Sequence, residues 1–98
     1  MIEIKIFEKA GVFAEDKDIA KSIRLTEVMS CLDKEEITFD FLNVEGATQS
    51  FIHALISDLI RKKGITILDK IYFKNCNETL RKIIDIVVEY MQDKDYDN

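Results

Sequence analysis

The sequence predicts an α/β fold in which helices pack on a small, mixed, mostly parallel sheet. Short runs of alternating apolar residues, typical of strands, are separated by longer segments in which apolar residues recur at helical spacing. The chain has no proline and only three glycines, so few residues interrupt regular elements. Strands separated by helices of this length pair in parallel through right-handed crossovers. The predicted order is strand, short strand, helix, strand, helix, strand, helix.

Length and composition predict one ordinary globular domain. The 98 residues suffice for a single core, which we expect over residues 1–93, with a frayed polar tail at residues 94–98. The chain is 47% hydrophobic and 34% charged, a balance that disordered proteins do not have. Its net charge of −5 argues against nucleic-acid binding, in which Lys and Arg contact phosphates.

The location of the protein and the redox state of its cysteines are predicted from signals that the sequence lacks. No apolar run approaches the ~20 residues of a membrane span, and the N-terminus does not resemble a signal peptide. We therefore expect a cytoplasmic protein without membrane contact, in which Cys31 and Cys76 are reduced; a disulfide between them is the alternative. Two cysteines and one histidine without ligand spacing predict no metal site, and we expect no cofactor.

The N-terminal segment is predicted to start with a strand. Ile2, Ile4 and Ile6 alternate with other residues, which indicates a strand with one buried face. Residues 9–11 form a predicted turn, after which residues 12–13 could begin a short return strand and make a hairpin.

The first long helix is predicted over residues 19–32, after an acidic segment suited to a helix N-terminus. Its apolar residues do not keep one helical phase. Either this helix is buried over a wide arc, which we prefer, or it bends or restarts near residues 22–26.

The second predicted strand covers residues 37–42, where Ile37, Phe39 and Phe41 alternate with other side chains. Asp40 is unusual there, because a carboxylate buried in a central strand needs a partner. We expect a structural role for Asp40, either solvated near the strand end or holding a neighbouring loop.

The strongest helical pattern runs from Thr48 to Lys63. Two rows of apolar residues at i, i+4 spacing form one broad stripe, namely Phe51, Leu55 and Leu59 beside Ile52, Ile56 and Ile60. Polar residues lie largely opposite, namely His53, Ser57, Asp58, Arg61 and Lys62. Thr48 is the predicted N-cap, and Gly64 the residue that ends the helix.

The C-terminal part predicts a strand and a last helix. Residues 65–68 are apolar and ambiguous, whereas residues 70–74 indicate a strand. Either Asn75 or Asn77 caps the following helix. That helix is predicted over residues 78–92, with Leu80, Ile83, Ile84, Val87, Val88 and Met91 on one face.

Residues 44–50 are the best candidate for a functional surface, because small polar side chains there lie next to a predicted helix N-terminus. Free backbone amides at such a start favour an anion, whether a bound phosphate or a phosphorylated Ser50 or Thr48. The plainer interpretation is that Thr48 only caps the helix and Ser50 is unmodified. Catalytic patterns are missing: no Gly-rich phosphate loop is present, His53 lies on the polar face, and Cys76 is better explained as a small apolar residue at a helix start.

Three short motifs point to a family. They are Ala20 with Arg24 in the first helix, Asp40-Phe41 at the strand end, and Ser50-Phe51 at the next helix start. In this order and spacing the chain resembles STAS domains, the anti-sigma-factor antagonist fold. It is most similar to the STAS-like family of unknown function. The resemblance covers residues 19–88.

The resemblance implies a role for Ser50. In the antagonists this helix begins Asp-Ser-Ser-Gly-Leu, and an ATPase-type kinase phosphorylates the second serine, which ends binding to that partner. Thr48 here takes the place of the Asp and Gln49 that of the first Ser. Ser50 matches the phosphorylated serine, whereas Phe51 and Ile52 stand for Gly and Leu. Of the residues with a role in that motif, the key serine is kept.

Together these observations predict a non-enzymatic regulatory module that binds a protein, with an ATPase-type kinase or anti-sigma-like protein as the implied partner. The predicted partner-binding residues are Val44, Glu45, Gly46, Thr48, Gln49, Ser50 and His53, with Ser50 as the phosphorylation candidate. Arg24 and Asp40 are predicted to be structural, and the chain a monomer or weak homodimer. One alternative is a module that binds a small ligand or nucleotide at the same helix N-terminus. Another is a small enzyme that uses Cys76, Asp40 or His53.

Overall fold

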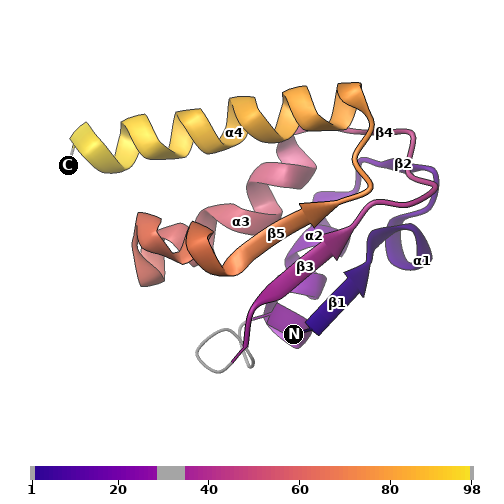
Figure 1. Ribbon diagram of the computed structural model, residues 1–98, viewed down its shortest axis with the longest axis horizontal. Helices are drawn as coiled ribbons and strands as arrows, with labels where there is room; N and C mark the ends of the chain where they lie inside the picture. Colours follow the sequence, from indigo (N-terminus) through magenta and orange to yellow (C-terminus); the bar gives the residue numbers. More distant parts are fainter. Residues whose placement is uncertain (1, 29–34, 98) are drawn as a thin grey trace.

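The computed structural model describes residues 2–28 and 35–97 and has two parallel sheets. The main sheet has the strand order β1-β3-β5, made of β1 (Ile2–Lys5), β3 (Ile37–Asp40) and β5 (Ile71–Lys74) (Figure 1). The smaller sheet pairs β2 (Phe13–Ala14) with β4 (Gly46–Ala47). The predicted fold class is confirmed. Cys31 lies outside the described residues.

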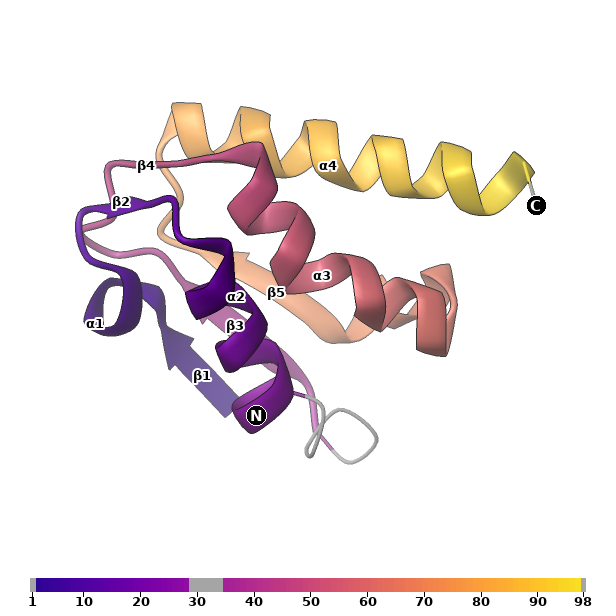
Figure 2. The same ribbon diagram turned by 180° about the vertical axis from the view of Figure 1, so that it is seen from behind.

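The helices that cover the main sheet gather on one of its faces. In Figure 2, α2 (Lys17–Ile23) and α3 (Gln49–Lys63) lie in front of the strands. The last helix, α4 (Glu78–Asp97), packs against α3, whose later turns diverge from it in Figure 2, and contacts β4. No described helix covers the opposite face, where Glu3, Tyr72 and Lys74 are exposed.

The core lies between the main sheet and α3. Both predicted apolar rows of α3 are buried, and Thr48 caps the helix as predicted. Gly64 ends α3 with a φ of 83°, which a residue with a Cβ adopts only at a cost. Ser57 corrects one detail, because it is buried at 4% exposure rather than lying on the polar face. From α4, the core takes Leu80, Ile84, Val87 and Met91.

The first long helix changes its winding partway. α2 ends at Ile23, and the chain continues as a π-helix, η1 (Arg24–Val28). Thr26 Oγ1 donates a hydrogen bond of 2.7 Å to the carbonyl oxygen of Ser22 at this transition. A π-turn contains an extra residue and so shifts the helical phase. The preferred prediction, one helix buried over a wide arc, is therefore wrong. The alternative, a bend or restart near residues 22–26, is closer to the structure. Residues 29–32 of the predicted helix lie outside the described part.

The prediction of an N-terminal hairpin is wrong. β1 ends at Lys5, because Ile6 begins a short helix, α1 (Ile6–Ala10), and is itself fully buried. β2 then pairs in parallel with the distant β4 and does not pair with β1. The phenyl ring of Phe13 lies against Gly46, where an added Cβ would come within 2.9 Å of the ring.

The C-terminal part settles two open alternatives. Residues 65–70 form a 3-10 helix, η2 (Ile65–Lys70), before β5. Asn77 caps α4, since its Oδ1 accepts a hydrogen bond of 2.8 Å from the Leu80 amide. α4 runs past the predicted end at Gln92, as far as Asp97. The second strand is also shorter than predicted and ends at Asp40.

Candidate functional site

Ser50 is exposed in the first turn of α3 and lines a groove of about 510 Å³. The first turns of α3 contribute Gln49, Ser50, His53 and Ala54 to the groove. α2 contributes its first residue, Lys17, and the middle of α4 contributes Ile86, Val87 and Tyr90. The groove therefore joins three helices that are distant in the sequence.

The position of Ser50 is fixed by its neighbours. The Phe51 amide donates a hydrogen bond of 3.1 Å to Thr48 Oγ1, which closes the helix start. The Thr48 amide in turn donates to the carbonyl oxygen of Ala14, at 3.0 Å. Phe51 and Ile52 are fully buried. The bulk of Phe51 thus points into the core, and it leaves the surface around Ser50 open.

The wall of the groove on α4 is apolar and accessible. Ile86 is 49% exposed and Tyr90 53% exposed, and they lie four residues apart on one face of the helix. The ring centroids of His53 and Tyr90 are 6.1 Å apart across the groove. Lys17 adds a positive charge to the same groove. The groove thus combines an apolar wall, a serine hydroxyl and a cation.

The predicted partner-binding residues divide into two groups. Glu45, Gln49 and Ser50 are exposed, and Thr48 and His53 are partly exposed. Val44 and Gly46 are buried, because β4 pairs with β2 and this segment packs into the core. Val44 belongs to the core, whereas the side-chain position of Gly46 is covered by the ring of the exposed Phe13.

Sequence reasoning missed Lys17, Ile86 and Tyr90. A signal existed for two of them. Ile86 and Tyr90 form an i, i+4 pair of large side chains outside the apolar stripe of the last helix. For Lys17 the sequence contains no comparable signal, since one lysine among acidic residues is ordinary at a helix start.

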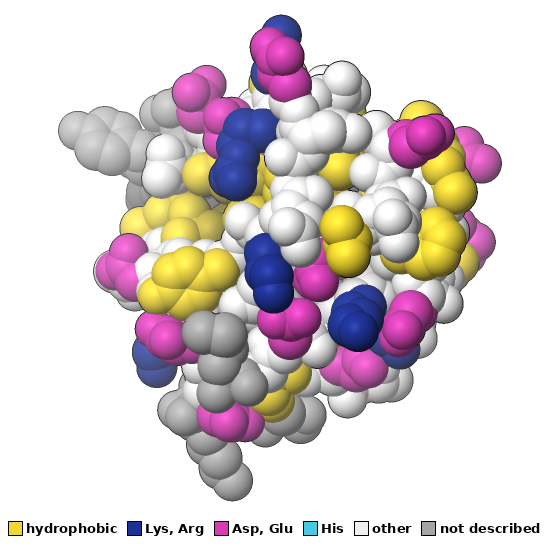
Figure 3. Space-filling model, turned by 45° about the vertical axis from the view of Figure 1, so that its right-hand side comes forward, with side chains coloured by type: hydrophobic (Ala, Val, Ile, Leu, Met, Phe, Trp, Pro, Cys, Tyr) yellow, Lys and Arg dark blue, Asp and Glu magenta, His cyan; other side chains and the backbone are white. Residues whose placement is uncertain are grey.

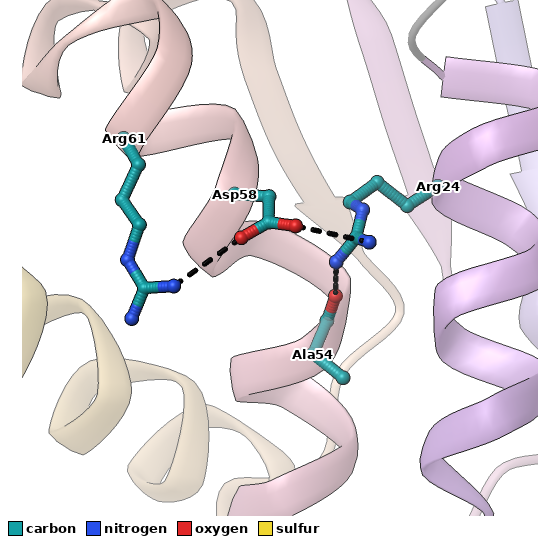
Figure 4. Close-up of polar contacts among 4 residues, drawn as sticks. All are labelled: Arg24, Ala54, Asp58 and Arg61. Atoms are coloured by element: carbon teal, nitrogen blue, oxygen red, sulfur yellow. Dashed lines mark hydrogen bonds and ion pairs between the residues drawn. The ribbon is translucent and has the colours of Figure 1, made fainter.

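Arg24 joins η1 to α3 (Figure 4). Its side chain is only 7% exposed, and Nη1 donates a hydrogen bond of 2.7 Å to the carbonyl oxygen of Ala54. Nη2 lies 3.0 Å from Oδ2 of Asp58, whose Oδ1 is 3.3 Å from Nη1 of the exposed Arg61. Because Ala54 lines the groove, Arg24 helps to hold the groove wall in place.

Asp40 joins the loops that follow β3 and β5. Its Oδ1 accepts hydrogen bonds of 2.9 Å from the side-chain amide of Asn75 and from the Leu42 amide. The bond from Asn75 is the main reason why the pKa of Asp40 lies below its ordinary value, followed by the bond from Leu42. Burial opposes these effects, and the charges of Lys74 and Lys5 add to them.

Cys76 is half-buried and forms no disulfide with a residue that the structure describes. Burial raises the pKa of its thiol, so the neutral form predominates at physiological pH and the sulfur is not an activated nucleophile. No group of three or more His, Cys, Asp or Glu residues is placed for a metal ion within residues 2–28 and 35–97. Over that same part of the chain, no helix has the length and apolar character needed to cross a membrane.

The comparisons with known proteins identify a family. Residues 20–81, more than half of the 98-residue chain, match the family described as the STAS-like domain of unknown function. The comparisons with curated proteins and with solved structures found no match. The matched segment runs from Ala20 through Ser50 to the first turn of α4 and contains all three short motifs. The chain belongs to the STAS-like domain family of unknown function.

Proposed function

We propose that this protein is a non-enzymatic regulatory module that binds a protein partner through the groove between α3 and α4. Phosphorylation of Ser50 would control that binding. One observation carries the proposal: the exposed hydroxyl of Ser50 lies in the same groove as the exposed apolar side chains of Ile86 and Tyr90. A modification of Ser50 would thus act directly on the binding surface.

The composition of the groove indicates the chemistry of the partner. Single exposed apolar residues are common, but Ile86 and Tyr90 lie on adjacent turns beside a hollow of about 510 Å³. Such a hollow fits an apolar side chain of a partner segment. Lys17 at the same groove favours an acidic residue next to that side chain. We infer that the partner presents an apolar segment with negative charge.

A phosphate on Ser50 would oppose this partner without harming the fold. It adds about −1.5 to −2 charges. The N-terminus of a helix favours negative charge, and Lys17 lies close enough to line the same groove. The phosphate would therefore occupy the groove and repel an acidic partner. The resemblance to anti-sigma-factor antagonists implies that the partner is an ATPase-type kinase or a related protein. The cytoplasmic location of the protein stays a prediction.

Binding by three variants tests the proposal. Tagged wild-type protein, Ser50→Ala and Ser50→Asp are used to capture partners from the native host. We expect Ser50→Ala to retain the captured protein and Ser50→Asp to lose it. Ser22→Asp is the matched control, because it adds the same charge on an exposed position of α2 that does not line the groove. Equal capture by Ser50→Asp and Ser22→Asp would contradict the role of Ser50.

The position of Lys17 also favours a second candidate function, the binding of a phosphate-bearing small ligand at the start of α3. Thermal unfolding with ATP, GTP or inorganic phosphate separates the two functions. Stabilisation by any of them that Lys17→Gln removes would support a ligand site. Unchanged unfolding temperatures would exclude it and leave the protein-binding function.

A further inference from the structure

A second groove, of about 310 Å³, lies where the three strands of the main sheet end. The register places Lys5, Asp40 and Lys74, the last residues of β1, β3 and β5, side by side. All three line the groove. In Figure 3, where the right-hand side of Figure 1 comes forward, basic and acidic side chains lie close together on this side of the molecule. Open parallel α/β sheets commonly bind ligands at this edge.

The central carboxylate has an unused oxygen. Asp40 is only 6% exposed, and both of its hydrogen bonds, from Leu42 and Asn75, go to Oδ1. Among the described residues, no donor bonds to Oδ2. Oδ2 is reached by solvent, because the one buried side-chain polar atom without a partner in the described part of the chain is Glu27 Oε2. An ionised carboxylate has acceptor capacity on both oxygens, so the groove contains an accessible acceptor that a ligand can use.

Two lysines line the groove together with this acceptor. Lys74 Nζ is 3.0 Å from Glu3 Oε2 and is thus already paired. Lys5 forms no ion pair with any residue that the structure describes, although its charge acts on Asp40. Oδ2 of Asp40 and the ammonium group of Lys5, neither of which is paired with a described residue, therefore line the same groove, on adjacent strands.

These charges select the class of ligand. A simple anion would meet Asp40 and Glu3, and a simple cation would meet Lys5 and Lys74. A molecule with both charges on neighbouring atoms satisfies Asp40 and Lys5 together. Beside them Leu42 is 56% exposed and Phe7 37% exposed, which provides an apolar wall. A volume of 310 Å³ corresponds to about ten water molecules at roughly 30 Å³ each, which is enough for a small amino acid.

We propose that this groove binds a free α-amino acid with an apolar side chain. Its ammonium group would donate to Oδ2 of Asp40, and its carboxylate would pair with Lys5. Its side chain would pack on Leu42 and Phe7. The hydrogen bond from Asn75 holds Asp40 in place before the ligand arrives, so little ordering is needed on binding.

Calorimetry on the whole chain tests this assignment. The ligands are L-leucine, L-methionine and L-phenylalanine. Leucinamide, which lacks the carboxylate, and 4-methylpentanoate, which lacks the ammonium group, are the matched halves of leucine. We expect at least one amino acid to bind at millimolar concentration or below, and each half-ligand to bind at least about tenfold more weakly, since each loses one charged contact. Absence of binding by all three amino acids, or equal binding by leucinamide, overturns the proposal.

Two variants identify the groove. Lys5→Gln removes the exposed cation, and Asp40→Asn keeps an acceptor for Leu42 while removing the charge. Each is expected to weaken amino-acid binding at least about tenfold, whereas Lys62→Gln, an exposed cation on α3, leaves it unchanged. Amide chemical shifts provide a readout that does not depend on the variants. The ligand should move the resonances of Leu42 and Asn75 but not that of Ser50. Shifts centred on Ser50 would contradict the assignment.

Discussion

Replacing Arg24 by alanine should remove about 3 kcal/mol of the free energy of unfolding. The hydrogen bond from Arg24 to the Ala54 carbonyl has a charged donor, and such bonds contribute about 1.5–3 kcal/mol. The ion pair with Asp58 adds at most about 1 kcal/mol, because Asp58 is 33% exposed. Asp58 would also keep Arg61, so no uncompensated buried charge results. A loss of about 3 kcal/mol lowers the melting temperature by roughly 12–24 °C in a domain of this size.

Arg61 provides the matched control, because it contacts the same carboxylate from the surface. It lies 3.3 Å from Asp58 and is 54% exposed, so Arg61→Ala should cost less than about 0.5 kcal/mol. Arg24→Lys should lie between the two, since one ammonium group cannot bond Ala54 and Asp58 as the guanidinium does. Urea denaturation followed by circular dichroism measures all three. Equal losses for Arg24→Ala and Arg61→Ala would mean that the buried hydrogen bond from Arg24 to Ala54 does not stabilise the fold.

Thr48, Asp40 and Cys76 each provide a further test. Thr48→Ala should cost about 1 kcal/mol in urea denaturation, because the Phe51 amide loses its acceptor, and Thr48→Ser should recover most of it. The pKa of Asp40 is lowered from 3.8, so its charge stabilises the fold above pH 3.8, and this stability is lost as the pH falls through the lower folded value. Wild type should therefore exceed Asp40→Asn in stability at neutral pH, with the difference shrinking below pH 3.8; a constant difference would refute this sign. In a Cys31→Ser background, alkylation of Cys76 by iodoacetamide should reach half its maximal rate above pH 9.0 and at a lower pH after unfolding.

Much of the fold was predictable because α3 and α4 have long, regular apolar stripes. Both rows of α3 and its Thr48 cap match the structure, since many residues agree on one helical phase. The pairing of β2 with β4 was not predictable. Each of these strands has two residues, and tertiary contacts between distant segments, rather than a sequence pattern, bring them together. The π-turn at Arg24 was not predictable either, because the sequence shows only that the apolar residues of this helix do not keep one helical phase.

The candidate site was predictable only on the side of α3. Ser50 follows from its place beside a cap, which is local information. The i, i+4 pair of Ile86 and Tyr90 is visible in the sequence, but its place opposite Ser50 depends on how α4 packs against α3, which the spacing does not report. Val44 and Gly46 were placed on the surface because small and polar neighbours suggested a loop, whereas Val44 packs into the core and Gly46 pairs with β2.

Photo-crosslinking from the groove would show whether a partner binds there and whether Ser50 controls that binding. A benzophenone amino acid replaces Tyr90 in the groove or, as the control, Tyr72, which is 44% exposed on the open face of the main sheet. The proteins that become crosslinked in the native host are then compared between the wild-type, Ser50→Ala and Ser50→Asp backgrounds. We predict one crosslinked species that forms from position 90, persists with Ser50→Ala and disappears with Ser50→Asp. The same species from position 72, or its persistence with Ser50→Asp, would contradict a partner surface controlled by Ser50.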